Sequence, residues 1–164
     1  MGSPVAVMGQ RESASIVTAA APETVFHLVT DPLELPSWNR AITSVVDAPP
    51  HLSIGSEWKV RMHTLGQSWV SRSRVSALDA TTHRFAYRSQ SDDGNPSYAD
   101  WEWQVDDGEG DATVTVTVDL NPATFWRRHL LVRIRRRSLR LEIIESLRAL
   151  NAAATAPPAD HSVL

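Results

Sequence analysis

Two kinds of hydrophobic periodicity divide the chain into a strand-rich part and one long helix. From Gly55 to Asp119, apolar and polar residues alternate in short segments that are separated by turn residues. Alternation with a period of two is typical of strands that bury one face and expose the other. After Pro122 the apolar residues follow a helical period, and neither Gly nor Pro interrupts them before Pro157. The pattern therefore predicts an antiparallel sheet followed by a long helix.

The strand-rich part predicts seven strands in all. We expect them at residues 12–20, 42–47, 57–64, 68–78, 83–89, 98–105 and 112–119. Two short helices should separate the first two strands. Pro22 stands at the start of one helix, and Asp31 followed by Pro32 is a typical beginning of the other.

The terminal helix should extend from Asn121 to Ala154, with Asn121 as its cap and Pro122 at its first position. Its apolar residues fall into two stripes: Leu130, Ile134, Leu141 and Ile144, and then Val132, Leu139, Ile143, Leu147 and Leu150. The side opposite them is predicted to face solvent: Arg128, Arg135, Ser138, Glu142 and Glu145. Four arginines lie between the stripes: Arg133, Arg136, Arg137 and Arg140. They either extend past the sheet to water or point into a partly polar cavity.

Length and composition limit the number of domains, the metal and cofactor chemistry, and the kinds of partner that the chain can have. A chain of 164 residues predicts one domain, at 12–154, with disordered tails at 1–11 and 155–164. The absence of cysteine excludes disulfides and thiolate metal sites, and the scattered histidines lack metal-ligand spacing, so we expect neither metal nor cofactor. A net charge of −3 and a pI of about 6.0 do not indicate a nucleic-acid partner. We expect a cytoplasmic protein that does not insert stably into membranes, as a monomer or a homodimer.

Four segments together resemble one known group of proteins. They are SIVTAAAPETVFHLVTDPLELPSWNRAITSV, IGSEWKV, WEWQVDDGEGDATVTVTVDL and ESLRALNA, the last within the terminal helix. In this order they resemble the START-like superfamily, specifically the bacterial SRPBCC or polyketide cyclase/dehydrase-like proteins. The resemblance implies an α+β helix-grip fold like that of Bet v 1, in which a seven-stranded antiparallel sheet wraps around the C-terminal helix. It also implies an internal cavity, because proteins of this fold bind sterols, lipids, polyketides or hormones, and some catalyse cyclisation or dehydration.

If the sheet wraps around the helix, strand parity identifies its concave face. That face carries Trp58, Val60, Met62, Trp69, Ser71, Ser73, Phe85, Tyr87, Trp101 and Trp103. Each of these residues has an alternative role in an ordinary core, but so many aromatic rings with a few polar groups are typical of a ligand pocket. The predicted ligand-binding residues are Trp38 at the entrance, Trp58, Met62, Trp69, Ser71, Phe85, Tyr87, Trp101, Trp103, His129 and Arg133.

The opposite face of the sheet carries complementary charges. Basic residues occur on the third to fifth strands, and Asp100 and Glu102 on the sixth, which favours a role in solubility and strand register. The segment WVSRSRV is similar to a strand on which some cyclases keep a cavity arginine. Parity directs Arg72 and Arg74 outward here, unless a bulge reverses the strand.

Three hypotheses for function follow. The first is the binding of a hydrophobic or amphipathic small molecule, lipid-like or polyketide-like, in the cavity. The second is a cofactor-independent polyketide cyclase or dehydratase that uses the same cavity. The third is a non-catalytic interaction module that docks through the basic segment from Arg127 to Arg140.

Overall fold

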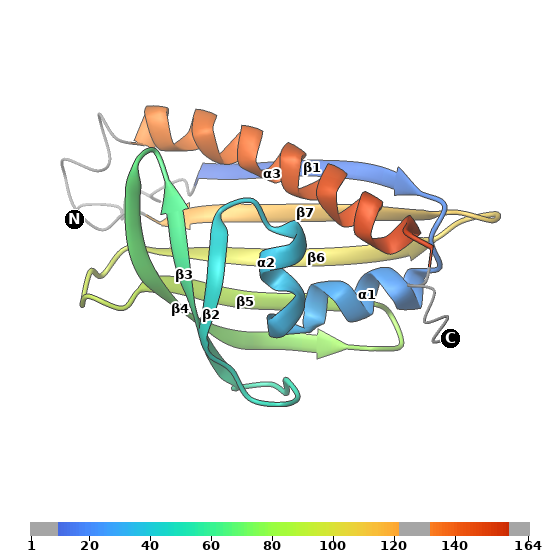
Figure 1. Cartoon of the computed structure of the whole chain (residues 1–164), viewed down its shortest axis with the longest axis horizontal. Helices are drawn as coiled ribbons and strands as arrows, with labels where there is room; N and C mark the ends of the chain where they lie inside the picture. Colours follow the sequence, from blue (N-terminus) through green and yellow to red (C-terminus); the bar gives the residue numbers. More distant parts are fainter. Residues whose placement is uncertain (1–9, 122–131, 158–164) are drawn as a thin grey trace, which may run out of the picture.

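The computed structural model of the chain describes residues 10–121 and 132–157. The strands are β1 (Gln10–Thr18), β2 (Ile42–Asp47), β3 (Glu57–Thr64), β4 (Gln67–Asp79), β5 (Arg84–Ser91), β6 (Tyr98–Asp107) and β7 (Ala112–Asn121). The helices are α1 (Pro22–Thr30), η1 (Pro32–Glu34), α2 (Leu35–Trp38) and α3 (Val132–Thr155). The predicted fold class is confirmed, since one antiparallel seven-stranded sheet accompanies the C-terminal helix and the short helices follow β1 (Figure 1).

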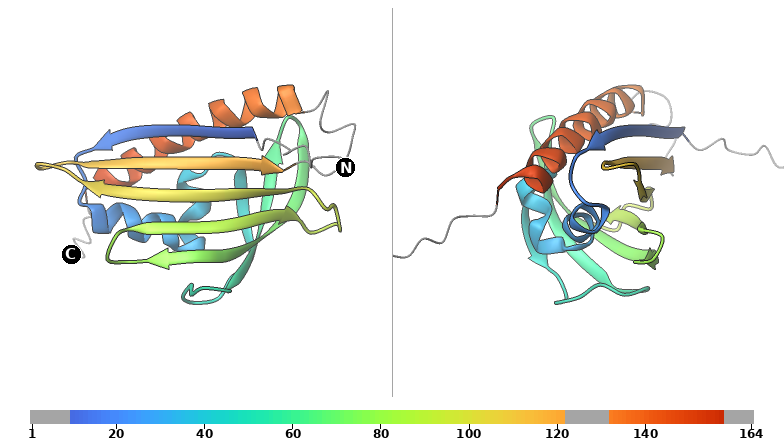
Figure 2. Two further views of the ribbon diagram at one scale, coloured as in Figure 1. Left: turned by 180° about the vertical axis from the view of Figure 1, so that it is seen from behind. Right: turned by 90° about the vertical axis from the view of Figure 1, so that its right-hand side faces the viewer.

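The sheet is strongly curved, and α3 crosses its concave side. The strand order is β1-β7-β6-β5-β4-β3-β2, so the first and second strands form the two edges. Figure 2 shows the strands curling around the space that α3 spans. The helix packs against β1 on one side and against α1 and α2 on the other. This arrangement leaves the middle of the concave face, on β3 to β6, as the floor of the space beneath the helix.

Strand β4 shows how parity positions the site. Ser71 and Ser73 are buried, whereas Arg72 and Arg74 are exposed on the outer face, as parity predicts. A shift in the pairing of β4 with β5 lies between Val75 and Ala77. A bulge of this kind reverses the faces beyond it, so Leu78 rather than Ala77 packs against the core. Because the bulge follows Arg74, it leaves both arginines outside.

The outer face carries the predicted ion pairs. Arg88 binds both carboxylate oxygens of Asp100 at 2.8 and 3.0 Å, and Arg84 binds Glu102 at 3.0 Å. These side chains are about half exposed, so each pair contributes at most about 1 kcal/mol. Their role is to support the β5–β6 register, and they keep positive charge away from the concave face.

The short helices begin as the sequence predicts. Asp31 precedes η1, and its Oδ1 accepts a hydrogen bond of 3.0 Å from the backbone N–H of Leu33. This cap satisfies a donor that the first turn would otherwise leave unpaired. The chain then continues into α2, which places Leu35 and Trp38 in the core.

The orientation of α3 differs from the prediction. One predicted stripe is buried, formed by Leu139, Ile143, Leu147 and Leu150. In the other stripe, Leu141 is 60% exposed and Ile144 half-buried. Glu142, predicted to face solvent, is instead half-buried beside the core stripe.

The predicted helix cap is also wrong. Asn121 belongs to β7, where it is paired with Tyr98 of β6, and its side-chain amide donates to the carbonyl of Asp119. Leu130 of the first stripe lies outside the described residues. The same holds for the side chains at 132–136, which include Val132, Arg133, Ile134 and Arg136.

Candidate functional site

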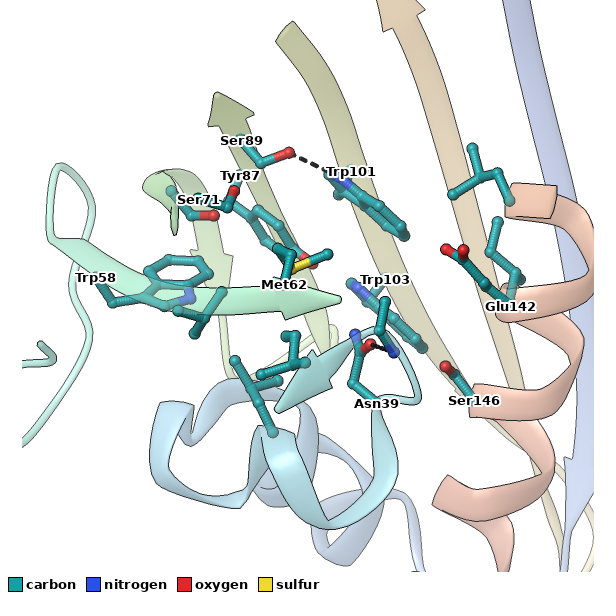
Figure 3. Close-up of a pocket in the computed structure, with 17 residues that line it drawn as sticks. Asn39, Trp58, Met62, Ser71, Tyr87, Ser89, Trp101, Trp103, Glu142 and Ser146 are labelled. Carbon is teal, nitrogen blue, oxygen red and sulfur yellow. Dashed lines mark hydrogen bonds between the residues drawn. The ribbon is translucent and has the colours of Figure 1, made fainter. Parts of the chain in front are cut away.

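A pocket lies between the concave face of the sheet, the α2–β2 connection and α3 (Figure 3). Its volume is small, about 50 Å³ as space open to the centres of water-sized spheres, and it opens to solvent on one side. The pocket is therefore a narrow slot.

The floor of the slot is aromatic. Trp58 comes from β3, Tyr87 from β5, and Trp101 and Trp103 from β6. The antiparallel register places Tyr87 directly opposite Trp101, with ring centroids 6.0 Å apart and nearly parallel planes. Trp58 meets Tyr87 edge to face at 4.9 Å. Each such pair contributes about 0.5–1.5 kcal/mol beyond simple burial, so the rings form a rigid wall.

The polar atoms of these rings are engaged within the sheet. Trp101 Nε1 donates a 3.1 Å hydrogen bond to the Ser89 hydroxyl, and the Trp103 side chain donates to the Tyr87 oxygen. Burial raises the pKa of the Tyr87 hydroxyl, and the hydrogen bond from Trp103 opposes this effect only in part. Tyr87 is therefore a neutral phenol over the ordinary pH range.

The side of the slot formed by α3 carries a carboxylate. Glu142 Oε1 accepts a hydrogen bond from the Thr64 hydroxyl at the end of β3 and another, of 3.0 Å, from the Ser138 hydroxyl. These two hydroxyls fix the orientation of the carboxylate and connect the β3–β4 hairpin to α3. Figure 3 shows Glu142 reaching from α3 toward the side of the pocket formed by Trp101 and Trp103.

Two further polar residues shape the wall near α2. Asn39 Oδ1 accepts the backbone N–H of Ala41 at 3.1 Å, and the Ser146 hydroxyl of α3 accepts the backbone N–H of Arg40 at 3.1 Å. The second bond ties the α2–β2 connection to the long helix. Asn39 therefore stabilises the α2–β2 connection itself, and Ser146 holds that connection against α3.

The structure brings together more than half of the residues predicted as ligand-binding. Trp58, Met62, Ser71, Tyr87, Trp101 and Trp103 all line the pocket. Trp69 is half-buried on the same strand as Ser71, but it is not among the described lining residues. His129 and the side chain of Arg133 lie outside the described residues.

Two other predicted site residues lie behind the aromatic floor. Trp38 is 1% exposed, and its indole N–H donates to the carbonyl of Leu28 at 3.2 Å. Its predicted place at the entrance is therefore wrong, since it packs edge to face against Trp103 with ring centroids 5.3 Å apart. Phe85 is equally buried, and both residues line a second, smaller cavity beneath the first.

Sequence reasoning missed the polar residues of the slot: Asn39, Ser89, Glu142 and Ser146. A signal for the helical ones was present. Ser138, Glu142 and Ser146 recur every four residues, each directly before a member of the buried stripe. Residues at this spacing share one helix face, so they form a polar stripe along the edge of the apolar one.

No cluster of three or more potential metal ligands occurs within 10–121 and 132–157. In the same part of the chain, no helix is long and apolar enough to cross a membrane.

Comparisons with known proteins place the whole described domain in one group. The model of the family described as "Polyketide cyclase / dehydrase and lipid transport" matches residues 10–155. No curated protein matches the chain in sequence.

Similar solved structures show the same fold. A START superfamily protein from Mycobacterium smegmatis has a TM-score of 0.71 and 16% identity, over 89% of this chain and 97% of that one. An aromatase/cyclase from Streptomyces sp. R1128 has a TM-score of 0.70 and 14% identity, over 88% and 93% of the two chains. Major latex-like protein 151 from Panax ginseng has a TM-score of 0.71 and 12% identity, over 91% of this chain and 99% of that one.

Proposed function

Since the chain belongs to the polyketide cyclase / dehydrase and lipid transport family of START-like proteins, we propose that it binds a hydrophobic or amphipathic small molecule in the pocket beneath α3. One observation carries this proposal. Tyr87 and Trp101 lie in the middle of the concave face, yet both are half-buried because their rings border the slot. Aromatic surface left open inside a fold is stabilised when an apolar ligand covers it, by about 25 cal/mol per Å².

The distribution of charge supports the same proposal. The arginines of β4 and β5 lie on the outer face, and the floor of the slot consists of uncharged side chains. The polar groups of the lining are concentrated along α3 and the α2–β2 connection. A ligand with an apolar body and a polar end fits this division, with its body against the sheet and its polar end near the helix.

The proposal is tested by isothermal titration of a panel of fatty acids, sterols, aromatic polyketides and long-chain amines. At least one class should bind, and Trp101→Ala should weaken its binding by roughly tenfold or more, because a large aromatic contact is lost. Trp69→Ala is the matched control, since Trp69 is a half-buried tryptophan that is not among the described lining residues. Equal losses in both variants would place the binding site elsewhere.

A second candidate function is catalysis of cyclisation or dehydration in the same slot. The observation in its favour is that a carboxylate, Glu142, and a phenol, Tyr87, both line the pocket, and such groups serve in general acid–base catalysis. The test compares the products of a synthetic poly-β-ketone thioester with and without the protein. A product ratio that changes with wild type but not with Glu142→Gln supports catalysis, and a ratio that equals the buffer control contradicts it.

A further inference from the structure

The slot and the smaller cavity beneath it share one wall. On the measure that gives about 50 Å³ for the slot, the second cavity has about 10 Å³. Four residues line both spaces: Leu35, Trp58, Tyr87 and Trp103. These side chains separate the two spaces, so a molecule in the slot ends against them.

The second cavity has a lining that suits an alkyl chain. The residues that line it and not the slot are Val29, Pro32, Trp38, Leu52 and Phe85. Among these five, Trp38 alone carries a polar side-chain atom, and its indole N–H already donates to the carbonyl of Leu28. A chain that entered this cavity would gain about fourfold in affinity for each methylene that it buries. The shared wall therefore decides whether longer ligands bind better.

Tyr87 is the member of the wall that a ligand touches. Trp58 and Trp103 are 3% and 2% exposed, whereas Tyr87 is half-buried and borders the slot. Its ring lies between rings that each line one space only. Phe85 of the second cavity is 5.2 Å away and Trp101 of the slot 6.0 Å away, measured between ring centroids. Removal of the Tyr87 ring should therefore join the two spaces.

Two contacts hold the Tyr87 ring in this position. The Trp103 side chain donates a hydrogen bond to the Tyr87 oxygen, and Trp58 packs edge to face against the ring at 4.9 Å. Trp103 is fixed in turn by its packing on Trp38, with ring centroids 5.3 Å apart. A displaced Tyr87 would leave a buried donor without its acceptor, which costs free energy. We therefore expect the ring to stay in place when a ligand binds.

We propose that Tyr87 closes the slot at its inner end, so that the ligand has a short apolar part, a chain of few carbons or a single ring, and is not a long-chain lipid. This inference rests on the proposed function, because it names the size class of the molecule that the pocket binds. The small volume of the slot agrees with it, since pockets that enclose drug-sized ligands have roughly 300–1,000 Å³.

A series of straight-chain primary alcohols from butanol to decanol measures the limit. Each alcohol is titrated calorimetrically into the full-length wild-type protein. Affinity should rise by up to about fourfold per methylene while the chain fills the slot, and should level off once the chain reaches Tyr87. A steady rise through decanol would overturn the inference.

Two tyrosine variants assign the limit to its residue. In Tyr87→Ala the ratio of the affinities for decanol and hexanol should be roughly tenfold higher than in the wild type, because the chain can enter the second cavity. The ratio is used since loss of the ring weakens the binding of every alcohol. Tyr98→Ala is the control and should keep the wild-type ratio, because Tyr98 lies under the guanidinium of Arg88 on the outer face of the sheet.

A third variant tests the wall without changing it. Leu52 lines the second cavity but not the slot, so Leu52→Ala widens the space behind Tyr87. With the Tyr87 ring in place, this variant should have the same decanol-to-hexanol ratio as the wild type. A higher ratio would mean that the chain already passes Tyr87.

Each outcome has a distinct meaning. If Tyr87→Ala keeps the wild-type ratio, or Leu52→Ala raises it, the inference is overturned while the proposed function stands. The same holds if no alcohol binds although the wider panel yields a ligand, since the slot then does not hold an alkyl chain. If nothing in either set binds, both fail. The wild-type series and Leu52→Ala decide the question even if Tyr87→Ala does not fold.

Discussion

At the scale of single residues, the two tryptophans of β6 have different roles. Trp103 is 2% exposed, packs edge to face on Trp38 and donates to Tyr87, so it belongs to the core as much as to the pocket. Trp101, two residues earlier on the same face of the strand, is half-buried and borders the slot. Stability should therefore depend mainly on one ring and ligand binding mainly on the other.

The matched pair of alanine variants tests this division. Trp103→Ala should lower the free energy of unfolding by about 3–5 kcal/mol, because it removes a fully packed ring and leaves a cavity. Trp101→Ala should lower the free energy of unfolding by distinctly less, since part of the Trp101 ring is exposed in the folded protein. Urea denaturation measures both values, and equal losses would contradict the assigned roles.

Tyr87 predicts a pH dependence at the alkaline end. Burial raises the pKa of its hydroxyl above the value of about 10 found in unfolded chains. Above that pH the unfolded state releases the proton and the folded state retains it, so this group's contribution to stability declines as pH rises. The decline should be shallower in Tyr87→Phe than in the wild type. Urea midpoints measured from pH 8 to 11 check this, and parallel curves would contradict it.

At the scale of elements, the rotation of α3 about its axis decides what the pocket contains. The buried stripe from Leu139 to Leu150 turns Glu142 and Ser146 toward the slot, whereas Leu141 remains on the surface. Leu147→Ala should therefore lower the free energy of unfolding by about 2–5 kcal/mol, because Leu147 is packed in the core. Leu141→Ala, the same substitution on the same helix, should change stability by no more than about 0.5 kcal/mol. Thermal or urea unfolding distinguishes the two, and reversed losses would refute this helix orientation.

The sequence predicted strands better than it predicted this rotation, for a physical reason. Each inward residue of a half-buried strand is flanked by outward ones, so Trp58, Trp103 and Val116 were assignable to the concave face from alternation alone. On α3, apolar residues extend beyond the buried arc, and Leu141 cannot be told from Leu139 by hydrophobicity. Only the positions of β1, α1 and α2 against the helix select the buried stripe.

The bulge in β4 and the place of Trp38 are two further features that the sequence alone did not predict. Ala77 and Leu78 are both apolar, so alternation does not show where the reversal falls. Trp38 is the last residue of the short helix α2, whose direction depends on the packing of α1 and α3 around it. In both cases the deciding contacts come from residues distant in sequence.

At the scale of the whole molecule, the slot is where the curved sheet and α3 fail to fill the space between them. A ligand that fills it should stabilise the fold, since binding to the native state alone adds about 2.7 kcal/mol at a concentration one hundred times the Kd. For a domain of this size, that corresponds to a rise in Tm of roughly 5–10 °C. Differential scanning fluorimetry with a bound member of the panel measures it. A ligand that leaves Tm unchanged in wild type, or raises it equally in Trp101→Ala, would not be bound in the slot.

The central claim, that this slot holds a small molecule, is tested most directly by native mass spectrometry of the protein purified from the organism that encodes it. The account predicts a fraction of molecules heavier than the chain by the mass of one small organic compound, which is released on denaturation and is depleted in Trp101→Ala. A protein that emerges only at the mass of its own chain, and that binds no compound of the lipid, polyketide and amine panel, would contradict the account.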